Sequence, residues 1–130
     1  VFKNDLGEFW VAHSISGQLE ENDGVQSMPL KKFLKDVKPG SFFVLRHALN
    51  ENGASHIVSQ TKRLLEERAP FDHSFDNSDT NNLYCSEFVN LVFKNQYGKD
   101  CFKEETRGDI DAYSFNSILE NSDFTEIYTW

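Results

Sequence analysis

Residues 83–89 read Leu-Tyr-Cys-Ser-Glu-Phe-Val and begin the strongest helical pattern in the chain, which runs on to Tyr97. Apolar residues recur there at three- and four-residue spacing, as on the buried face of an amphipathic helix. Asn81 or Asn82 is suited to cap the start of this helix, and Gly98 is suited to end it. The pattern therefore predicts a helix over residues 83–97, against which the rest of the fold packs.

Cys85 lies in the first turn of this predicted helix. Unpaired backbone amides and the helix dipole favour an anion there, and the thiolate is the nucleophilic form of cysteine. Cys85 shares a helix face with Phe88, Val89 and Val92, so its side chain is predicted to point toward a sheet. Backbone amides at the helix start could also hold an oxyanion. The position thus suits nucleophilic catalysis.

His13 lies in a predicted strand, residues 8–15, on the face that it shares with Phe9, Val11 and Ile15. A histidine facing the cysteine could accept the thiol proton and return it to the leaving group. A second interpretation stays open at this point, because free cysteines and strand histidines also serve as ordinary core residues. Cysteine and histidine spacing alone does not decide between the two.

The remaining pattern alternates strands and helices along the chain. It predicts strands at residues 1–3, 41–46 and 124–128, helices at 29–36, 54–68 and 114–120, and loops at 17–24, 69–82 and 100–111. This order favours an α+β fold in which helices pack on an antiparallel sheet. A chain of 130 residues has the size of a single domain, here residues 1–130. Because the first strand is short and opens directly into a hairpin, we expect the domain to be incomplete at its N-terminus.

Composition and charge exclude several classes of function. Acidic residues outnumber basic ones by 21 to 13, for a net charge of −8, which disfavours nucleic acid as a partner. No apolar stretch approaches the roughly 20 residues of a membrane span. The two cysteines make no disulfide framework, and the four histidines lack the spacing of a zinc site, so we expect no metal and no cofactor.

Two segments together resemble a known family. Residues 70–76 read PFDHSFD, and after a short Asp- and Asn-rich stretch residues 83–89 read LYCSEFV. This order resembles the circularly permuted NlpC-like peptidases, the YiiX branch of the papain-like fold. The likeness extends over nearly the whole chain and implies an antiparallel sheet packed with helices, with the nucleophile at a helix N-terminus.

The resemblance also implies roles for individual residues. Cys85 matches the family's nucleophile. His13 matches the polar residue that orients the general base, and base function is its second possibility. Tyr84, before the nucleophile, is expected to help line the oxyanion site, whereas Glu87 and Asp72 match motif positions that we interpret as structural. The family's base lies on its first core strand, so we expect the counterpart of that base to precede residue 1.

By resemblance the chain is a cysteine peptidase or amidase that cleaves an amide or acyl bond through an acyl-enzyme on Cys85. Cell-wall peptides, small peptides and lipid-linked amides are the implied substrates, and a bacterial cell envelope is the implied location. One alternative is an acyltransferase of the lecithin:retinol acyltransferase type. Another is a catalytically inactive module that binds a peptide or lipid. A histidine segment upstream of residue 1 would count against this second alternative.

Overall fold

The computed structural model describes residues 1–19, 22–48, 50–79 and 81–129, and also leaves the side chain of Asp36 undescribed. Its elements, in chain order, are β1 (Phe2–Lys3), β2 (Phe9–Ile15), β3 (Gly24–Pro29), α1 (Leu30–Phe33), the 3₁₀ turn η1 (Leu34–Asp36), β4 (Phe43–His47), α2 (Glu51–Glu67), α3 (Cys85–Tyr97), β5 (Glu104–Arg107), β6 (Ile110–Tyr113), η2 (Phe115–Glu120) and β7 (Phe124–Thr129). Within these described residues, no helix combines the length and apolar character needed to cross a membrane.

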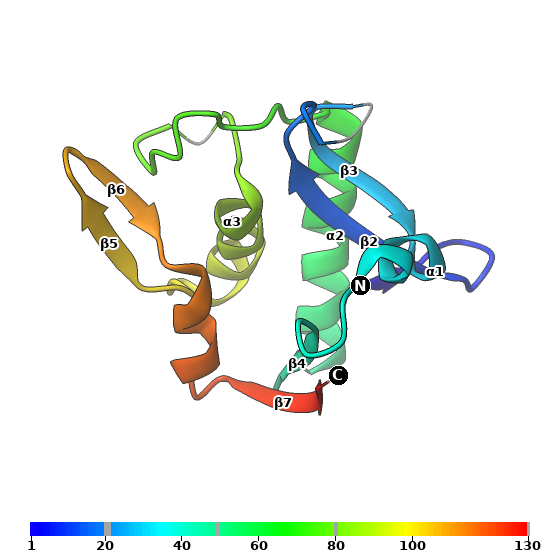
Figure 1. Cartoon of the computed structure of the whole chain (residues 1–130). Helices are drawn as coiled ribbons and strands as arrows, with labels where there is room; N and C mark the ends of the chain where they lie inside the picture. The colour runs from blue at the N-terminus through cyan, green and yellow to red at the C-terminus, as the bar shows by residue number, and fades with distance from the viewer. Residues whose placement is uncertain (20–21, 49, 80, 130) are drawn as a thin grey trace.

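The strands form three antiparallel sheets among the described residues. β1, β2 and β3 form one sheet, β4 pairs with β7 and β5 pairs with β6. In the first sheet Phe2 lies opposite Trp10, and Ala12 lies opposite Ser27. Figure 1 shows this sheet and the β5–β6 hairpin at opposite sides of the molecule, with α3 between them. The predicted α+β class is confirmed, although the strands are divided among several small sheets.

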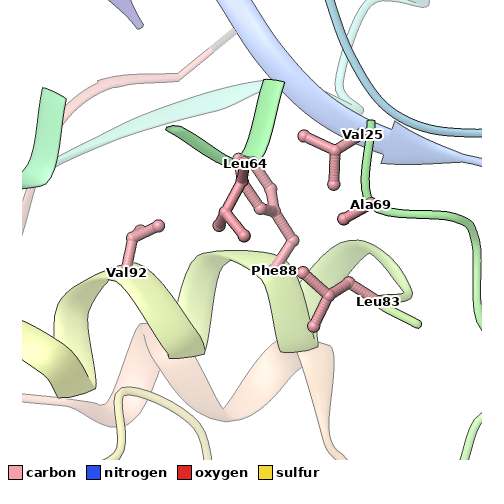
Figure 2. Packing of buried hydrophobic residues seen from close by; sticks show 6 residues of the cluster. All are labelled: Val25, Leu64, Ala69, Leu83, Phe88 and Val92. Carbon is pink, nitrogen blue, oxygen red and sulfur yellow. The ribbon is translucent and has the colours of Figure 1, made fainter. Parts of the chain in front are cut away.

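The main core lies where α2 and α3 meet the first sheet. Its buried members come from β3, from α2 and the chain that follows it, and from α3 and the residue two places before it. They are Val25, Leu64, Ala69, Leu83, Phe88 and Val92. Figure 2 shows Phe88 and Leu64 at the centre of this cluster, between α3 and the segments that carry Val25 and Ala69. Ala12 of β2 packs against the same cluster, which ties the strand to the helix.

The structure corrects several boundaries that the pattern predicted. β3 was not predicted: only Gly24 lies in the predicted loop at 17–24, residues 25–28 had no predicted element, and Pro29 was expected to begin the helix at 29–36. The β5–β6 hairpin falls mostly in the region predicted as a loop at residues 100–111. The hairpin strands are mostly exposed and polar on both faces, so they lack the alternation that indicates a strand. α3 begins at Cys85 and not at Leu83, because the Leu83 N–H donates to the carbonyl of Pro70 at 2.9 Å.

Candidate active site

Cys85 is the first residue of α3, and its side chain is exposed. Tyr84 is the N-cap residue, with extended backbone (φ −80°, ψ 174°), so neither Asn81 nor Asn82 has the predicted capping role. The Glu87 carboxylate accepts the backbone N–H of Tyr84 at 3.3 Å, which satisfies one donor at the helix start. The apolar face that was predicted to carry Cys85 buries Phe88 and Val92, while the thiol itself faces outward.

Strand β2 is joined to the segment that enters α3. The Ser14 hydroxyl donates to the Leu83 carbonyl at 2.5 Å, two residues before Cys85, and Ser14 is buried. Ala12, on the same strand face as Ser14, packs in the main core. The start of α3 is thus attached to the sheet by a side-chain hydrogen bond and by core packing, which fixes where Cys85 lies.

His13 lies on the other face of β2, because side chains alternate along a strand. Its ring meets the ring of Phe33 in α1 edge-on, with the centroids 5.9 Å apart. Ala12 and Ser14, the residues on either side of it, face α3. The structure therefore places the His13 ring on the α1 side of the sheet and does not direct it toward the helix that Cys85 begins.

The Tyr84 side chain is buried and its hydroxyl makes two structural hydrogen bonds. It donates to Asn77 Oδ1 at 2.6 Å and accepts the backbone N–H of Tyr113 at 2.7 Å. Burial raises the pKa of Tyr84 to about 12, so the phenol stays protonated at neutral pH. This hydroxyl joins the loop before α3 to the β5–β6 hairpin, a connection that the sequence pattern did not indicate.

The loop that leads to Cys85 is held by the buried carboxylate of Asp72. It accepts the backbone N–H of Ser74 at 2.7 Å and that of Asp76 at 2.8 Å. On the rim of the loop, His73 Nε2 lies 3.2 Å from Asp23 Oδ1, and both side chains are partly exposed. The Asp72 carboxylate thus serves to shape the loop, as carboxylates that accept local backbone amides do.

Glu87 is a buried carboxyl group, with 4% of its surface exposed, two residues after Cys85. Burial, together with the nearby carboxylates of Asp72, Asp79 and Asp76, raises the pKa of Glu87 to about 8. The folded protein therefore holds a proton on Glu87 at pH values where the unfolded chain, with an ordinary pKa of about 4.3, has lost it. Stability should fall as pH rises through the window between these two pKa values, because the folded state binds more protons there.

Replacing Glu87 with Gln should remove this pH dependence, because Gln is neutral and can still accept the Tyr84 N–H. At about pH 8 we expect Glu87→Gln to raise the free energy of unfolding by about 2 kcal/mol, and the difference should vanish below about pH 4. Urea unfolding of the variant and the parent at several pH values measures this difference in the free energy of unfolding. Glu66→Gln, an exposed carboxyl on α2, is the control and should change stability by less than about 0.5 kcal/mol. A Glu87→Gln protein that is less stable than the parent at pH 8 contradicts this account.

The second cysteine, Cys101, lies in a separate buried cluster with Phe102 and Ile118. Burial, together with the neighbouring Asp100 carboxylate, raises the pKa of the Cys101 thiol to about 12. Its backbone N–H donates to the side chain of buried Asn90 at 2.7 Å. Both cysteines are free thiols, and no group of three or more His, Cys, Asp or Glu side chains among the described residues has a metal-binding arrangement.

Several residues that shape the site were not singled out by sequence reasoning. Ser14 and Tyr113 act through hydrogen bonds to residues that lie 69 and 29 positions away, and Asn77 accepts the Tyr84 hydroxyl from seven positions away. No local sequence pattern predicts these bonds. Phe75 offered a usable signal, because it is an aromatic residue isolated in a polar loop. An apolar side chain in such a loop indicates either a packing anchor or a contact surface.

The fold and the site define the class of this protein: an α+β chain in which a free, exposed cysteine begins the helix that packs against an antiparallel sheet. Residues 3–122 match the family described as "Permuted papain-like amidase enzyme, YaeF/YiiX, C92 family". The chain belongs to this family of papain-like amidases, and this confirms the resemblance and the cysteine hydrolase class inferred from the sequence.

A solved structure supports the same fold. The chain is similar to a protein described as metalloprotein yiiX from Escherichia coli O157:H7, with a TM-score of 0.80 and 18% sequence identity. The match covers 98% of this chain and 79% of that one. At this identity the likeness shows the papain-like fold. Among curated proteins, none matches the chain.

Proposed function

We propose that this protein cleaves an amide or acyl bond with Cys85 as the nucleophile. The observation that carries the proposal is the exposed thiol at the first residue of a 13-residue helix. The first backbone N–H groups of a helix have no partner within it, so they favour a thiolate and can bind the oxyanion that forms when it attacks.

The reaction would proceed through an acyl-enzyme. The Cys85 sulfur attacks the carbonyl carbon, a C–S bond forms, and the C–N or C–O bond breaks as the leaving group takes a proton. Water then attacks the thioester, which releases a carboxylic acid and restores the thiol. An imidazole is the natural carrier of the proton in both steps.

For His13 we propose a positioning role toward such an imidazole. The ring lies on the α1 side of β2, so direct proton exchange with Cys85 would require a different arrangement from the one described. For Tyr84 we propose that its contribution to the oxyanion site is to hold the helix start, since its hydroxyl already has two partners. The amides of the first turn then supply the oxyanion donors.

The proposed substrates are cell-wall peptides, small peptides or lipid-linked amides, and the proposed location is the bacterial envelope.

A related acyltransferase would form the same thioester but pass the acyl group to an acceptor other than water. Adding a competing alcohol or amine distinguishes the two, because a transferase gives mainly the transfer product and a hydrolase mainly the acid. An inactive binding module would form no thioester, and the placement of the His13 ring on the α1 side of β2 is compatible with it.

Trapping the thioester tests the proposal directly. The protein is mixed with p-nitrophenyl acetate, quenched in acid and analysed by intact and peptide mass spectrometry. We expect one added acetyl group, located on Cys85, that decays as water releases it. Cys101 serves as the internal control, because it is buried. Stable acetylation of lysines alone, with none on Cys85, would favour the binding module.

A further inference from the structure

Phe75 combines two features that folded proteins rarely keep in one residue. Its backbone has φ of 55°, in the left-handed region, and 48% of its surface is exposed. A bulky L-residue in that region is strained by about 1–2 kcal/mol, and an exposed phenyl ring leaves apolar surface in water. Strain of this kind persists where the surroundings impose it, and it gathers at active sites and ligand clamps.

The surroundings of Phe75 impose this conformation. The Asp72 carboxylate accepts the N–H of Ser74 with one oxygen and that of Asp76 with the other, so it closes the loop on both sides of Phe75. Beyond the loop, the N–H of Asn77 donates to the Asp111 carbonyl at 3.1 Å. These three bonds, two of them to a buried carboxylate, fix the backbone on both sides of an exposed aromatic residue.

The ring of Phe75 packs on the residue that precedes the nucleophile position. It packs on the Tyr84 ring with centroids 5.5 Å apart, and it meets the buried Phe71 ring edge-on at 5.7 Å. Tyr84 immediately precedes Cys85, and its hydroxyl is anchored at both hydrogen-bonding positions. One side of Phe75 is therefore supported by a rigid aromatic group on the residue before Cys85, and about half of the Phe75 surface, 48%, faces solvent.

We propose that Phe75 is a specificity-determining residue: its exposed ring receives an apolar group, aliphatic or aromatic, next to the substrate carbonyl that Cys85 attacks. This inference rests on the proposed role of Cys85 and adds the chemical class of the group beside the scissile bond. Burying a few methylene groups or one ring against Phe75 removes apolar surface from water, and this gives the preference.

Alkylation of Cys85 tests the inference without requiring turnover. Iodoacetamide, N-butyl iodoacetamide and N-benzyl iodoacetamide form the same C–S bond and release iodide, but they differ in the apolar group carried next to the reacting centre. Each rate at Cys85 is measured by peptide mass spectrometry and divided by the rate for the same cysteine in the urea-unfolded chain. The butyl and benzyl reagents distinguish an aliphatic from an aromatic preference.

We expect the folded protein to favour at least one apolar reagent over iodoacetamide by about fivefold or more. Phe75→Gly should reduce that ratio to about one, since Gly adopts a φ of 55° without strain and removes the ring. Phe75→Asn is a second variant that also tolerates this backbone. Phe115→Ala is the control, because Phe115 is similarly exposed but lies on η2.

The inference is overturned if the folded protein shows no apolar preference, or if Phe75→Gly and Phe75→Asn keep it. Failure of the proposed function looks different: no thioester would form on Cys85, whatever the alkylation ratios. A loss of preference in Phe115→Ala equal to that in Phe75→Gly would also overturn the inference, because the effect would not depend on the ring beside Cys85.

Discussion

Replacing Cys85 with Ala should lower kcat/KM for an activated amide or ester by about 1,000-fold or more, because no other group can form the thioester. Cys85 is exposed at the start of α3, so removing its sulfur leaves the core unchanged. We therefore expect the free energy of unfolding to change by less than about 0.5 kcal/mol. Release of p-nitrophenol and urea unfolding measure the two quantities on the same preparation.

Cys101→Ala is the matched control for this substitution. Cys101 is buried with Phe102 and Ile118, so its removal should reduce stability and leave kcat/KM within about twofold. Cys85→Ala should thus lower kcat/KM without lowering stability, and Cys101→Ala should lower stability without lowering kcat/KM. If Cys85→Ala retained the parent rate, another residue would be the nucleophile and the proposed function would be wrong.

Replacing Gly24 with Ala should have the largest effect on stability. Gly24 has φ of +90°, and a Cβ there would lie 2.2 Å from the Ala69 carbonyl oxygen and 2.8 Å from Pro70 Cα. The next residue, Val25, donates its N–H to that same carbonyl at 2.8 Å. The close atoms all belong to the backbone of Ala69 and Pro70, which cannot move aside as the end of a flexible side chain can. We therefore expect a loss of about 3 kcal/mol or more in the free energy of unfolding.

Gly7→Ala separates the clash from the strain of a positive φ. Gly7 has φ of +78°, and nothing lies within 4 Å of the position a Cβ would take. We expect Gly7→Ala to lower the free energy of unfolding by only about 1 kcal/mol, measured by urea unfolding. Equal losses for the two variants would mean that the close approach of β3 to the chain at Ala69 and Pro70 does not contribute, contrary to this account. That approach matters for the site, because the loop leading to Cys85 starts there.

The sequence predicted the parts of the fold that repeat a local pattern. The strand at β2 and the helices at α2 and α3 follow from apolar spacing, and Gly98 ends α3 in a left-handed conformation as expected. β3 was not predicted because its residues include Gly, Gln, Ser and Pro, which are weak strand formers. Its antiparallel pairing with β2 stabilises the strand. Tertiary pairing outweighed local preference there.

In the candidate site too, the sequence predicted the features set by local pattern but not those set by tertiary contacts. The position of Cys85 at a helix start follows from the local pattern, within two residues. The exposure of its thiol and the direction of the His13 ring depend on which face of each element the core covers. The Tyr84 hydroxyl contacts Asn77, seven residues before it, and Tyr113, 29 residues after it. A single sequence carries no pattern for such contacts, so only the structure supplied them.

The most direct test of the central claim is the rate at which iodoacetamide modifies Cys85 at about pH 6, compared with the same cysteine in the urea-unfolded chain. Peptide mass spectrometry follows Cys85 and Cys101 separately in one sample. If the start of α3 favours a thiolate, the folded protein should react at Cys85 several times faster than the unfolded chain and stay unmodified at buried Cys101. A folded-state rate at Cys85 equal to or below the unfolded rate would contradict the claim that this cysteine is the activated nucleophile.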